Sequence, residues 1–158
     1  MESINPIVIS SRAPDFILHD QDDQEVRLSN LKGKKVLLSF HPLAWTGVCA
    51  DQMKSLEANF ERFSGSNAVA FGISIDSVPC KKAWAKSLAI SKTQFLADFW
   101  PHGEVAQAYG LFREISGFSY RANVWIDETG NVLWVKTYPL SQSPDIEEVL
   151  AVVNRSLG

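Results

Sequence analysis

The chain has 158 residues, of which 46% are hydrophobic, and a net charge of -3. This length and apolar content predict a single domain over residues 1–158, large enough to bury a core without disulfides or metals. A slightly acidic chain without basic runs is not expected to bind nucleic acid. No apolar run approaches the roughly 18 residues of a membrane span, and no leader precedes the first apolar segment, so we expect a cytoplasmic protein with no membrane partner.

The predicted elements alternate between extended and helical segments. In chain order the pattern predicts a hairpin over 15–28, a buried strand over 35–40, a helix over 47–63, a buried strand over 68–75, a helix after Ser77, an extended segment over 93–97, a short helix over 104–109, a hairpin over 122–135 and a last helix capped by Ser143-Pro144. The lysine pairs Lys34-Lys35 and Lys81-Lys82 are interpreted as parts of ordinary polar faces.

This order predicts an α/β fold with a mixed central sheet, helices on both faces and an N-terminal β-hairpin extension, a thioredoxin-like arrangement. We expect the helices that follow strands 35–40 and 68–75 to lie on opposite faces of the sheet. Sites in open α/β sheets form beyond the carboxyl ends of the parallel strands. The loop from Phe40 to Cys49 lies at that edge, so the functional site is expected there.

Cys49 stands where a buried strand turns into a helix. The unpaired N–H groups and partial positive charge of a helix N-terminus favour a thiolate, which is the nucleophilic form of cysteine. Met53 and Leu56 continue the apolar stripe, so the sulfur is expected in the first turn, half turned to the core. Because burial alone would keep a thiol protonated, the thiolate needs a cationic partner from elsewhere in the chain.

Around this cysteine the sequence reads Pro42-x-x-x-Thr46-x-x-Cys49, and a later strand opens with Arg121. The motif resembles the active site of peroxiredoxins of the AhpC/TSA type, and Arg121 falls where that family places its second-half arginine. The resemblance extends over nearly the whole chain. Segment 98–110 is most similar to the alkyl hydroperoxide reductase E-like branch of the family.

The resemblance implies a thiol-dependent peroxidase, an antioxidant oxidoreductase that reduces hydrogen peroxide and organic hydroperoxides through a Cys49 sulfenic acid. It implies no bound cofactor. The redox-active center would be restored by a thiol reductant, either a thioredoxin-like or glutaredoxin-like protein or a low-molecular-weight thiol. A homodimer is expected, and Trp45, Phe112 and Phe118 are expected to form an apolar rim or to lie in the dimer contact.

Peroxide cleavage explains why the family needs these residue types. The thiolate attacks one peroxide oxygen while negative charge grows on the other, so the site must stabilise both charges and orient the O–O bond. Arg121 would donate several N–H bonds to the sulfur and the oxygens, the Thr46 hydroxyl would orient the substrate, and Pro42 would shield the sulfur from water.

Each residue also has a plain structural interpretation. A single cysteine on a helix stripe is usually inert, Thr46 alone suits a helix N-cap, Pro42 a turn, and Arg121 a solvated strand end. We interpret His41 as structural rather than as a general base, because a thiolate needs none. Metal binding is not expected, because the cysteines and histidines lack close-spaced ligand pairs.

Cys80 is the other thiol of the chain and a candidate resolving cysteine. It lies at the start of a predicted helix but shares a face with Trp84, so a core position suits it equally. A direct bridge to Cys49 is expected to require unwinding of both helix starts. The family's early resolving position holds Lys54 here, and the E-like branch typically uses one cysteine. Gln52 stands where relatives commonly carry a glutamate. The glutamine lacks the negative charge that a glutamate would place near the cysteine.

Two other functions are open from the sequence. A thiol-disulfide oxidoreductase should carry Cys-x-x-Cys at the first helix start, whereas this chain has Thr46 three residues before Cys49. A peroxide-sensing redox protein would share the motif. Single-turnover peroxide kinetics separate such a sensor from a peroxidase.

Overall fold

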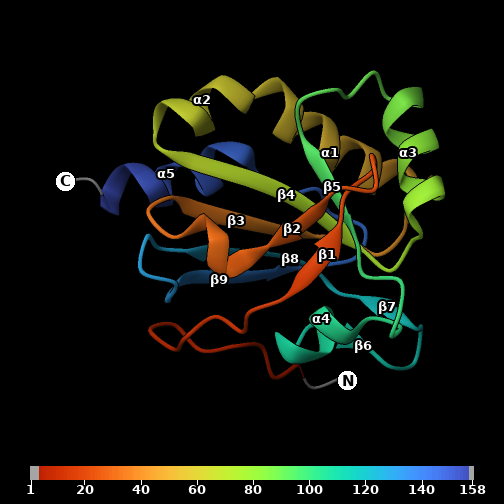
Figure 1. The fold of residues 1–158 in the computed structure, drawn as a ribbon. Coiled ribbons are helices and arrows are strands. Elements are labelled where there is room, and N and C mark those ends of the chain that lie inside the picture. The colour runs from red at the N-terminus through yellow and green to blue at the C-terminus, as the bar shows by residue number, and fades with distance from the viewer. Residues whose placement is uncertain (1–3, 157–158) are drawn as a thin grey trace.

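The structure, a computed structural model, describes residues 4–156 and is built around a mixed sheet (Figure 1). Its strands are β1 (Ile17–His19), β2 (Glu25–Arg27), β3 (Lys35–Phe40), β4 (Ala68–Ser74), β5 (Gln94–Ala97), β8 (Arg121–Ile126) and β9 (Val132–Tyr138). Within the described residues they follow the order β2-β1-β5-β4-β3-β8-β9. β3, β4 and β5 are parallel, and the other neighbours are antiparallel. The predicted α/β fold with a mixed sheet is confirmed.

Helices cover both faces of this sheet, as predicted. They are α1 (Gly47–Ala58), α2 (Phe60–Gly65), α3 (Val78–Ser87), α4 (Glu104–Ala108) and α5 (Ile146–Ser156), with a 3-10 helix η1 (Leu28–Leu31) and a small hairpin of β6 (Phe112–Arg113) and β7 (Phe118–Ser119). Figure 1 shows α1, α2, α3 and α5 on one face and α4 on the other. Among the described residues, none of the helices combines the length and apolar composition needed to cross a bilayer.

The expectation that the helices after β3 and β4 lie on opposite faces is wrong. Met53 of α1 and Trp84 of α3 belong to one buried cluster on the same side of the sheet. The chain moves from β3 to β4 to β5 in one direction across the sheet, and right-handed crossovers that advance in one direction lie on the same face. The first turns of α1 and α3 therefore lie in the same layer.

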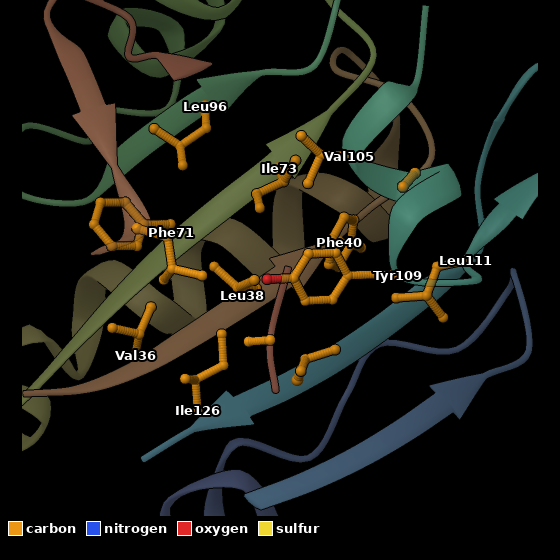
Figure 2. Packing of buried hydrophobic residues seen from close by; sticks show 14 of the residues in the cluster. Val36, Leu38, Phe40, Phe71, Ile73, Leu96, Val105, Tyr109, Leu111 and Ile126 are labelled. Atoms are coloured by element: carbon orange, nitrogen blue, oxygen red, sulfur yellow. The ribbon is translucent and has the colours of Figure 1, made fainter. Parts of the chain in front are cut away.

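Strand β3 reads as a continuous apolar run because it is buried on both faces. Leu37 packs into the cluster under α1 and α3, whereas Val36, Leu38 and Phe40 point into the cluster on the other face, where Tyr109 joins them (Figure 2). Successive side chains of a strand alternate between faces, so a central strand covered by helices on both sides needs apolar residues at every position.

The single helix predicted over 47–63 is divided in two at Asn59. This residue leaves the helical conformation, with φ -109° and ψ 16°, and α2 begins at the next residue. The Asn59 side chain donates a hydrogen bond to the Ser55 carbonyl at 2.8 Å. Asparagine competes with the backbone for such bonds and so favours helix ends.

The two lysine pairs are not ordinary polar faces, and that interpretation is corrected. Lys34 and Lys82 are exposed, but the partner lysine of each pair is buried. Lys35 Nζ lies 3.4 Å from a carboxylate oxygen of Glu128. Lys81 is fully buried on α3, where the helix faces the sheet.

Candidate active site

Cys49 lies in the first turn of α1, at the end of the loop that follows β3. Its side chain is 1% exposed, and it belongs to the same buried cluster as Met53, one turn further along. The first-turn position is as expected, whereas the side chain is fully buried and not half turned to the core. Thr46 has extended backbone and directly precedes the helix, so Cys49 lies among the first residues of α1, whose backbone N–H groups have no partner within the helix.

Arg121 reaches the sulfur from the neighbouring strand. It is the first residue of β8, which pairs antiparallel with β3 so that Ala122 lies opposite Phe40. The start of β8 therefore lies beside the end of β3, where the cysteine loop begins. Arg121 Nη1 donates to Cys49 Sγ at 3.3 Å, and the side chain is 3% exposed. The guanidinium thus places a permanent positive charge next to the buried sulfur.

Neutral acceptors hold the rest of the guanidinium. Arg121 Nη1 donates to Gln52 Oε1 at 2.7 Å, and Nη2 donates to the Leu140 carbonyl at 2.7 Å. Gln52 is buried and in turn donates to Ser39 Oγ at 2.7 Å and to the Phe40 carbonyl at 3.2 Å. None of the described carboxylates forms an ion pair with Arg121. The glutamine therefore orients the arginine without adding negative charge next to the sulfur.

The Arg121 Nε–H has no hydrogen-bond partner among the described residues, although it is buried. A buried donor without a partner is costly, and such groups concentrate where a ligand is to be bound. This donor is available to an oxygen that enters beside Cys49.

Thr46 and Pro42 line the loop but differ in exposure. The Thr46 hydroxyl donates to the Leu43 carbonyl at 2.8 Å and does not cap α1, so the N-cap interpretation fits its backbone and not its side chain. A hydroxyl bound in this way keeps its oxygen free to accept a further hydrogen bond. Thr46 is exposed, whereas Pro42 is buried. The two residues therefore stand on the solvent side and the inner side of the loop.

Asp76 fixes the middle of this loop, a role that the sequence analysis missed. One oxygen of its carboxylate accepts from the Ala44 N–H at 2.8 Å and from Ser74 Oγ at 2.6 Å. Trp45, the next residue in the loop, is held at a φ of +68°, which is unusual for a bulky residue, and is 57% exposed. Asp76 follows the carboxyl end of β4, and its position at that edge was the available signal.

His41 and Lys81 form a buried pair beneath the loop. Lys81 Nζ lies 3.1 Å from His41 Nε2, and both side chains are fully buried. The imidazole packs against the rings of Trp84 and Phe95, which also contact each other. Burial and then the charge of Lys81 hold the pKa of His41 well below its usual range, so the imidazole is neutral. This environment agrees with a structural His41 rather than a general base.

Cys80 lies in the first turn of α3, and its thiol faces Asp76. Its N–H donates to Ser77 Oγ at 3.4 Å, and its Sγ lies 3.8 Å from the second carboxylate oxygen of Asp76. Burial and the Asp76 charge raise the pKa of the Cys80 thiol, while the Trp45 side chain opposes the shift. Both cysteines are free thiols, and within the described residues no cluster of three or more His, Cys, Asp or Glu could hold a metal ion.

Comparison with known proteins identifies the family. Residues 9–135 match the sequence model of the AhpC/TSA family. The chain belongs to this family. It is 40% identical over 123 residues to alkyl hydroperoxide reductase E of Mycobacterium tuberculosis, a match that covers 77% of this chain and 80% of that protein. It is 34% identical over 154 residues to a peroxiredoxin of Thermoplasma volcanium, covering 94% of this chain and 74% of the relative.

The solved structures agree with the sequence relatives. The reduced 2-Cys peroxiredoxin of Plasmodium vivax matches with a TM-score of 0.88 at 29% identity, covering 96% of this chain and 83% of that chain. The resemblance to peroxiredoxins, and to alkyl hydroperoxide reductase E among them, is confirmed. This AhpC/TSA protein is accordingly a thiol-dependent peroxidase, an oxidoreductase.

Proposed function

We propose that Cys49 is the cysteine that attacks the peroxide, and that Arg121, Thr46 and Pro42 form its pocket. The observation that carries this assignment is the 3.3 Å hydrogen bond from Arg121 Nη1 to Cys49 Sγ. It joins a buried sulfur at a helix start to a guanidinium that lacks an ion-paired carboxylate. A permanent positive charge next to a sulfur favours the thiolate, which is the nucleophilic form of cysteine.

The reaction follows from this arrangement. The Cys49 thiolate attacks one peroxide oxygen, the S–O bond forms as the O–O bond breaks, and the leaving oxygen departs as hydroxide or alkoxide and takes up a proton. The unpartnered Arg121 Nε–H stabilises the charge on that oxygen. The Thr46 oxygen accepts the proton-bearing end of the peroxide, and Pro42 keeps water from the sulfur. The products are a Cys49 sulfenic acid and water or an alcohol.

Hydrogen peroxide and organic hydroperoxides are the proposed substrates. Trp45 is exposed on the cysteine loop, and Phe112 and Phe118 are half-buried on the β6–β7 hairpin. We assign these three side chains to an apolar rim that favours organic hydroperoxides.

We propose that an external thiol restores Cys49, supplied by a thioredoxin-like or glutaredoxin-like protein or by a low-molecular-weight thiol. The surroundings of Cys80 support this choice over an internal resolving role. Its thiol is directed toward the Asp76 carboxylate, and its raised pKa disfavours the thiolate that would attack a sulfenic acid. Mass spectrometry after one peroxide equivalent distinguishes the two routes, since a Cys49–Cys80 bridge would support Cys80 as the resolving cysteine.

We further propose a cytoplasmic homodimer. Trp100 is 81% exposed and Ile115 is 80% exposed. Their loops are joined by the hydrogen bond between His102 Nε2 and the Gly117 carbonyl at 2.6 Å. Large apolar side chains exposed on adjacent loops are suited to contact with a second copy of the chain. A pair of free thiols suits a compartment in which reducing thiols are abundant.

Single-turnover kinetics test the proposed function. Reduced protein is mixed with hydrogen peroxide or an organic hydroperoxide, and tryptophan fluorescence follows oxidation. We expect wild-type protein to react at least about 1000-fold faster than free cysteine, and Arg121→Ala to react about 100-fold more slowly than wild type with its fold intact. Cys49→Ser should give no signal, and Cys80→Ser should keep the wild-type rate of this first step.

Arg27→Ala is the matched control, because Arg27 is a surface arginine of β2 at the far edge of the sheet. Its rate should equal that of the wild type. If wild-type Cys49 reacts no faster than free cysteine, the assignment of Cys49 as the attacking thiol is wrong.

A further inference from the structure

The reaction described above makes no use of Lys81, although this residue is a buried amine next to the active-site loop. Its side chain is 0% exposed, with Nζ 3.1 Å from His41 Nε2 and 5.4 Å from the centre of the Phe95 ring. None of the described carboxylates lies within ion-pair distance of Nζ. A cation in such a place depends on the ring, the imidazole and more distant charges for its stability.

Packing connects this amine to Cys49. His41 directly precedes Pro42; its N–H donates to the Ile73 carbonyl at 3.0 Å, and its carbonyl accepts from Ser119 Oγ at 3.2 Å. The His41 ring and the Met53 side chain both pack over Gly72. A Cβ there would lie 3.3 Å from His41 Cε1 and 2.3 Å from Met53 Sδ.

Met53 lies one helical turn after Cys49. The Lys81 amine, the His41 ring and the Met53 side chain therefore form one packed column that ends at the first turns of α1. Gly72 makes this column possible, because an added methyl group would collide with Met53.

Several charged groups act on Lys81 and on its partner His41. Burial lowers the pKa of Lys81 to about 7, against the opposing effect of negative charge on Asp76, Cys49, Cys80 and Asp98. Asp76 and Asp98 already accept backbone N–H bonds, and the charge of Arg121 acts on the His41 side of the pair.

The interaction between Lys81 and Cys49 is reciprocal. If a Cys49 thiolate favours the protonated amine, the protonated amine favours the thiolate by the same free energy.

We propose that Lys81 is a positioning residue of the peroxidase: through His41 it holds the base of the active-site loop, and its protonated amine stabilises the Cys49 thiolate. This inference rests on the proposed role of Cys49. It gives the site a second positive charge that depends on pH, in addition to the permanent charge of Arg121.

The same coupling accounts for the proton of the reaction. When the thiolate becomes a neutral sulfenic acid, the amine loses its anionic neighbour and releases a proton to solvent, while the leaving alkoxide takes one up. The balanced change is Cys49–S⁻ + Lys81–NH₃⁺ + ROOH giving Cys49–SOH + Lys81–NH₂ + ROH. The sulfur is oxidised by two electrons and the peroxide is reduced by two.

The first test compares Lys81→Met with Lys82→Met, which removes the exposed neighbouring lysine. Oxidation by hydrogen peroxide is followed by stopped-flow fluorescence from pH 6 to 9. Below pH 7 the wild type should react about fivefold faster than Lys81→Met, and the ratio should approach one at pH 9 as Lys81 loses its charge. Lys82→Met should match the wild type throughout. A ratio of one at every pH overturns the inference.

A second measurement does not require the buried variant to fold well. The pH titration of the Lys81 ε-carbon, followed by NMR, is compared between reduced wild type and Cys49→Ser. Removing the Cys49 charge should lower the midpoint of Lys81. An unchanged midpoint overturns the inference. The two proposals fail separately: if wild-type Cys49 does not react rapidly with peroxide, the proposed function is wrong, whereas rapid oxidation that is independent of Lys81 rejects only the positioning role.

Discussion

At the scale of single residues, the site combines a charged donor with neutral supports. Arg121 contacts the Cys49 sulfur, a glutamine side chain and a backbone carbonyl. A glutamate in place of Gln52 would compete with the thiolate for the guanidinium and would face the Phe40 carbonyl without a hydrogen to donate. The amide avoids both conflicts because it accepts on one side and donates on the other.

Gln52→Met is predicted to remove this support while nearly keeping the volume of the side chain. The Phe40 carbonyl and one N–H of Arg121 would lose a partner in a buried place, so we expect a loss of about 2–3 kcal/mol in the free energy of unfolding. A less well oriented guanidinium should also slow Cys49 oxidation about tenfold. Urea unfolding and stopped-flow oxidation measure the two effects. Gln142→Met, at an exposed position, is the control, and an unchanged oxidation rate in Gln52→Met would contradict the orienting role.

Lys81 is also predicted to make stability depend on pH. Its pKa is about 7 in the folded protein and near its ordinary value of 10.5 in the unfolded chain. Between these values the unfolded chain binds the extra proton, so this group makes the fold more stable as pH rises from 7 to 10.5, by an amount on the order of 5 kcal/mol.

Urea unfolding of wild type and Lys81→Met at pH 6.5 and 9.5 tests this expectation, because other titrating groups cancel in the difference. The free energy of unfolding of Lys81→Met should exceed that of the wild type by most at pH 6.5. Lys82→Met should show no such pH dependence. A difference that is the same at both pH values would contradict a strongly lowered pKa.

At the scale of elements, the site is assembled where the starts of α1 and α3 meet the ends of β3 and β4 and the start of β8. Asp76 ties the cysteine loop to the end of β4, and β8 brings Arg121 to the end of β3. The far end of α1 is fixed as well, because the Glu57 carboxylate accepts N–H bonds from Ser91, Lys92 and Thr93. Helix α1 is thus held at both ends.

Glu57→Gln is predicted to loosen the far end of α1. Burial alone would raise the pKa of Glu57, but hydrogen bonds from Ser91, Thr93 and Lys92 hold this pKa below its usual 4.5. The ionised carboxylate therefore stabilises the fold above that pH, and this stabilisation is lost as pH falls. One amide oxygen cannot accept all of these bonds, and we expect a loss of about 1–2 kcal/mol at pH 7. Thermal unfolding with Glu61→Gln as the surface control measures it. Equal stability of the two variants would show that the carboxylate is dispensable.

The sequence predicted the elements that depend on local pattern. It did not predict those that depend on a particular side-chain bond or on the arrangement of the whole sheet. The junction of β3 and α1 follows from a buried strand next to a helical stripe, so the position of Cys49 could be predicted from local pattern. The break at Asn59 depends on a side-chain bond to Ser55, which periodicity does not register. Placing α1 and α3 on one face required the order of the strands, which is a property of the whole sheet.

The candidate site shows the same division. Arg121 could be assigned only through a family motif. It lies near Cys49 because β3 and β8 pair antiparallel, and local sequence pattern does not show which strands pair. Lys81 was missed because a lysine pair normally marks a polar surface, and only the packing of α3 shows that one of the two lies inside. Asp76 was missed for a similar reason, because its main partner is a backbone N–H that has no signature in the sequence.

At the scale of the whole molecule, the two most exposed large apolar side chains of the described residues, Trp100 and Ile115, lie on loops that adjoin each other. The segment around Trp100 contacts the β6–β7 hairpin through His102 and Gly117, and that hairpin carries Ile115 at its turn. Figure 1 shows this hairpin beside α4, at the opposite end of the molecule from α2.

The double variant Trp100→Glu/Ile115→Glu is predicted to be monomeric, because two carboxylates would be buried without partners in the proposed contact. Sedimentation velocity over a range of concentrations should show a dimer for the wild type and a monomer for the variant. Val8→Glu, at an exposed apolar position in the N-terminal segment, is the control and should remain dimeric. A dimeric double variant would place the contact elsewhere.

The bond from Arg121 Nη2 to the Leu140 carbonyl extends the site to the end of the chain. Leu140 lies in the segment that joins β9 to α5, and α5 is docked by the bond from Trp125 Nε1 to the Val149 carbonyl and by the ion pair of Lys136 with Glu148. A fusion partner that pulls α5 from the sheet would therefore release one side of the guanidinium. Such a fusion protein should lose reactivity toward peroxide before it loses its fold, which makes the C-terminus the end to leave untagged.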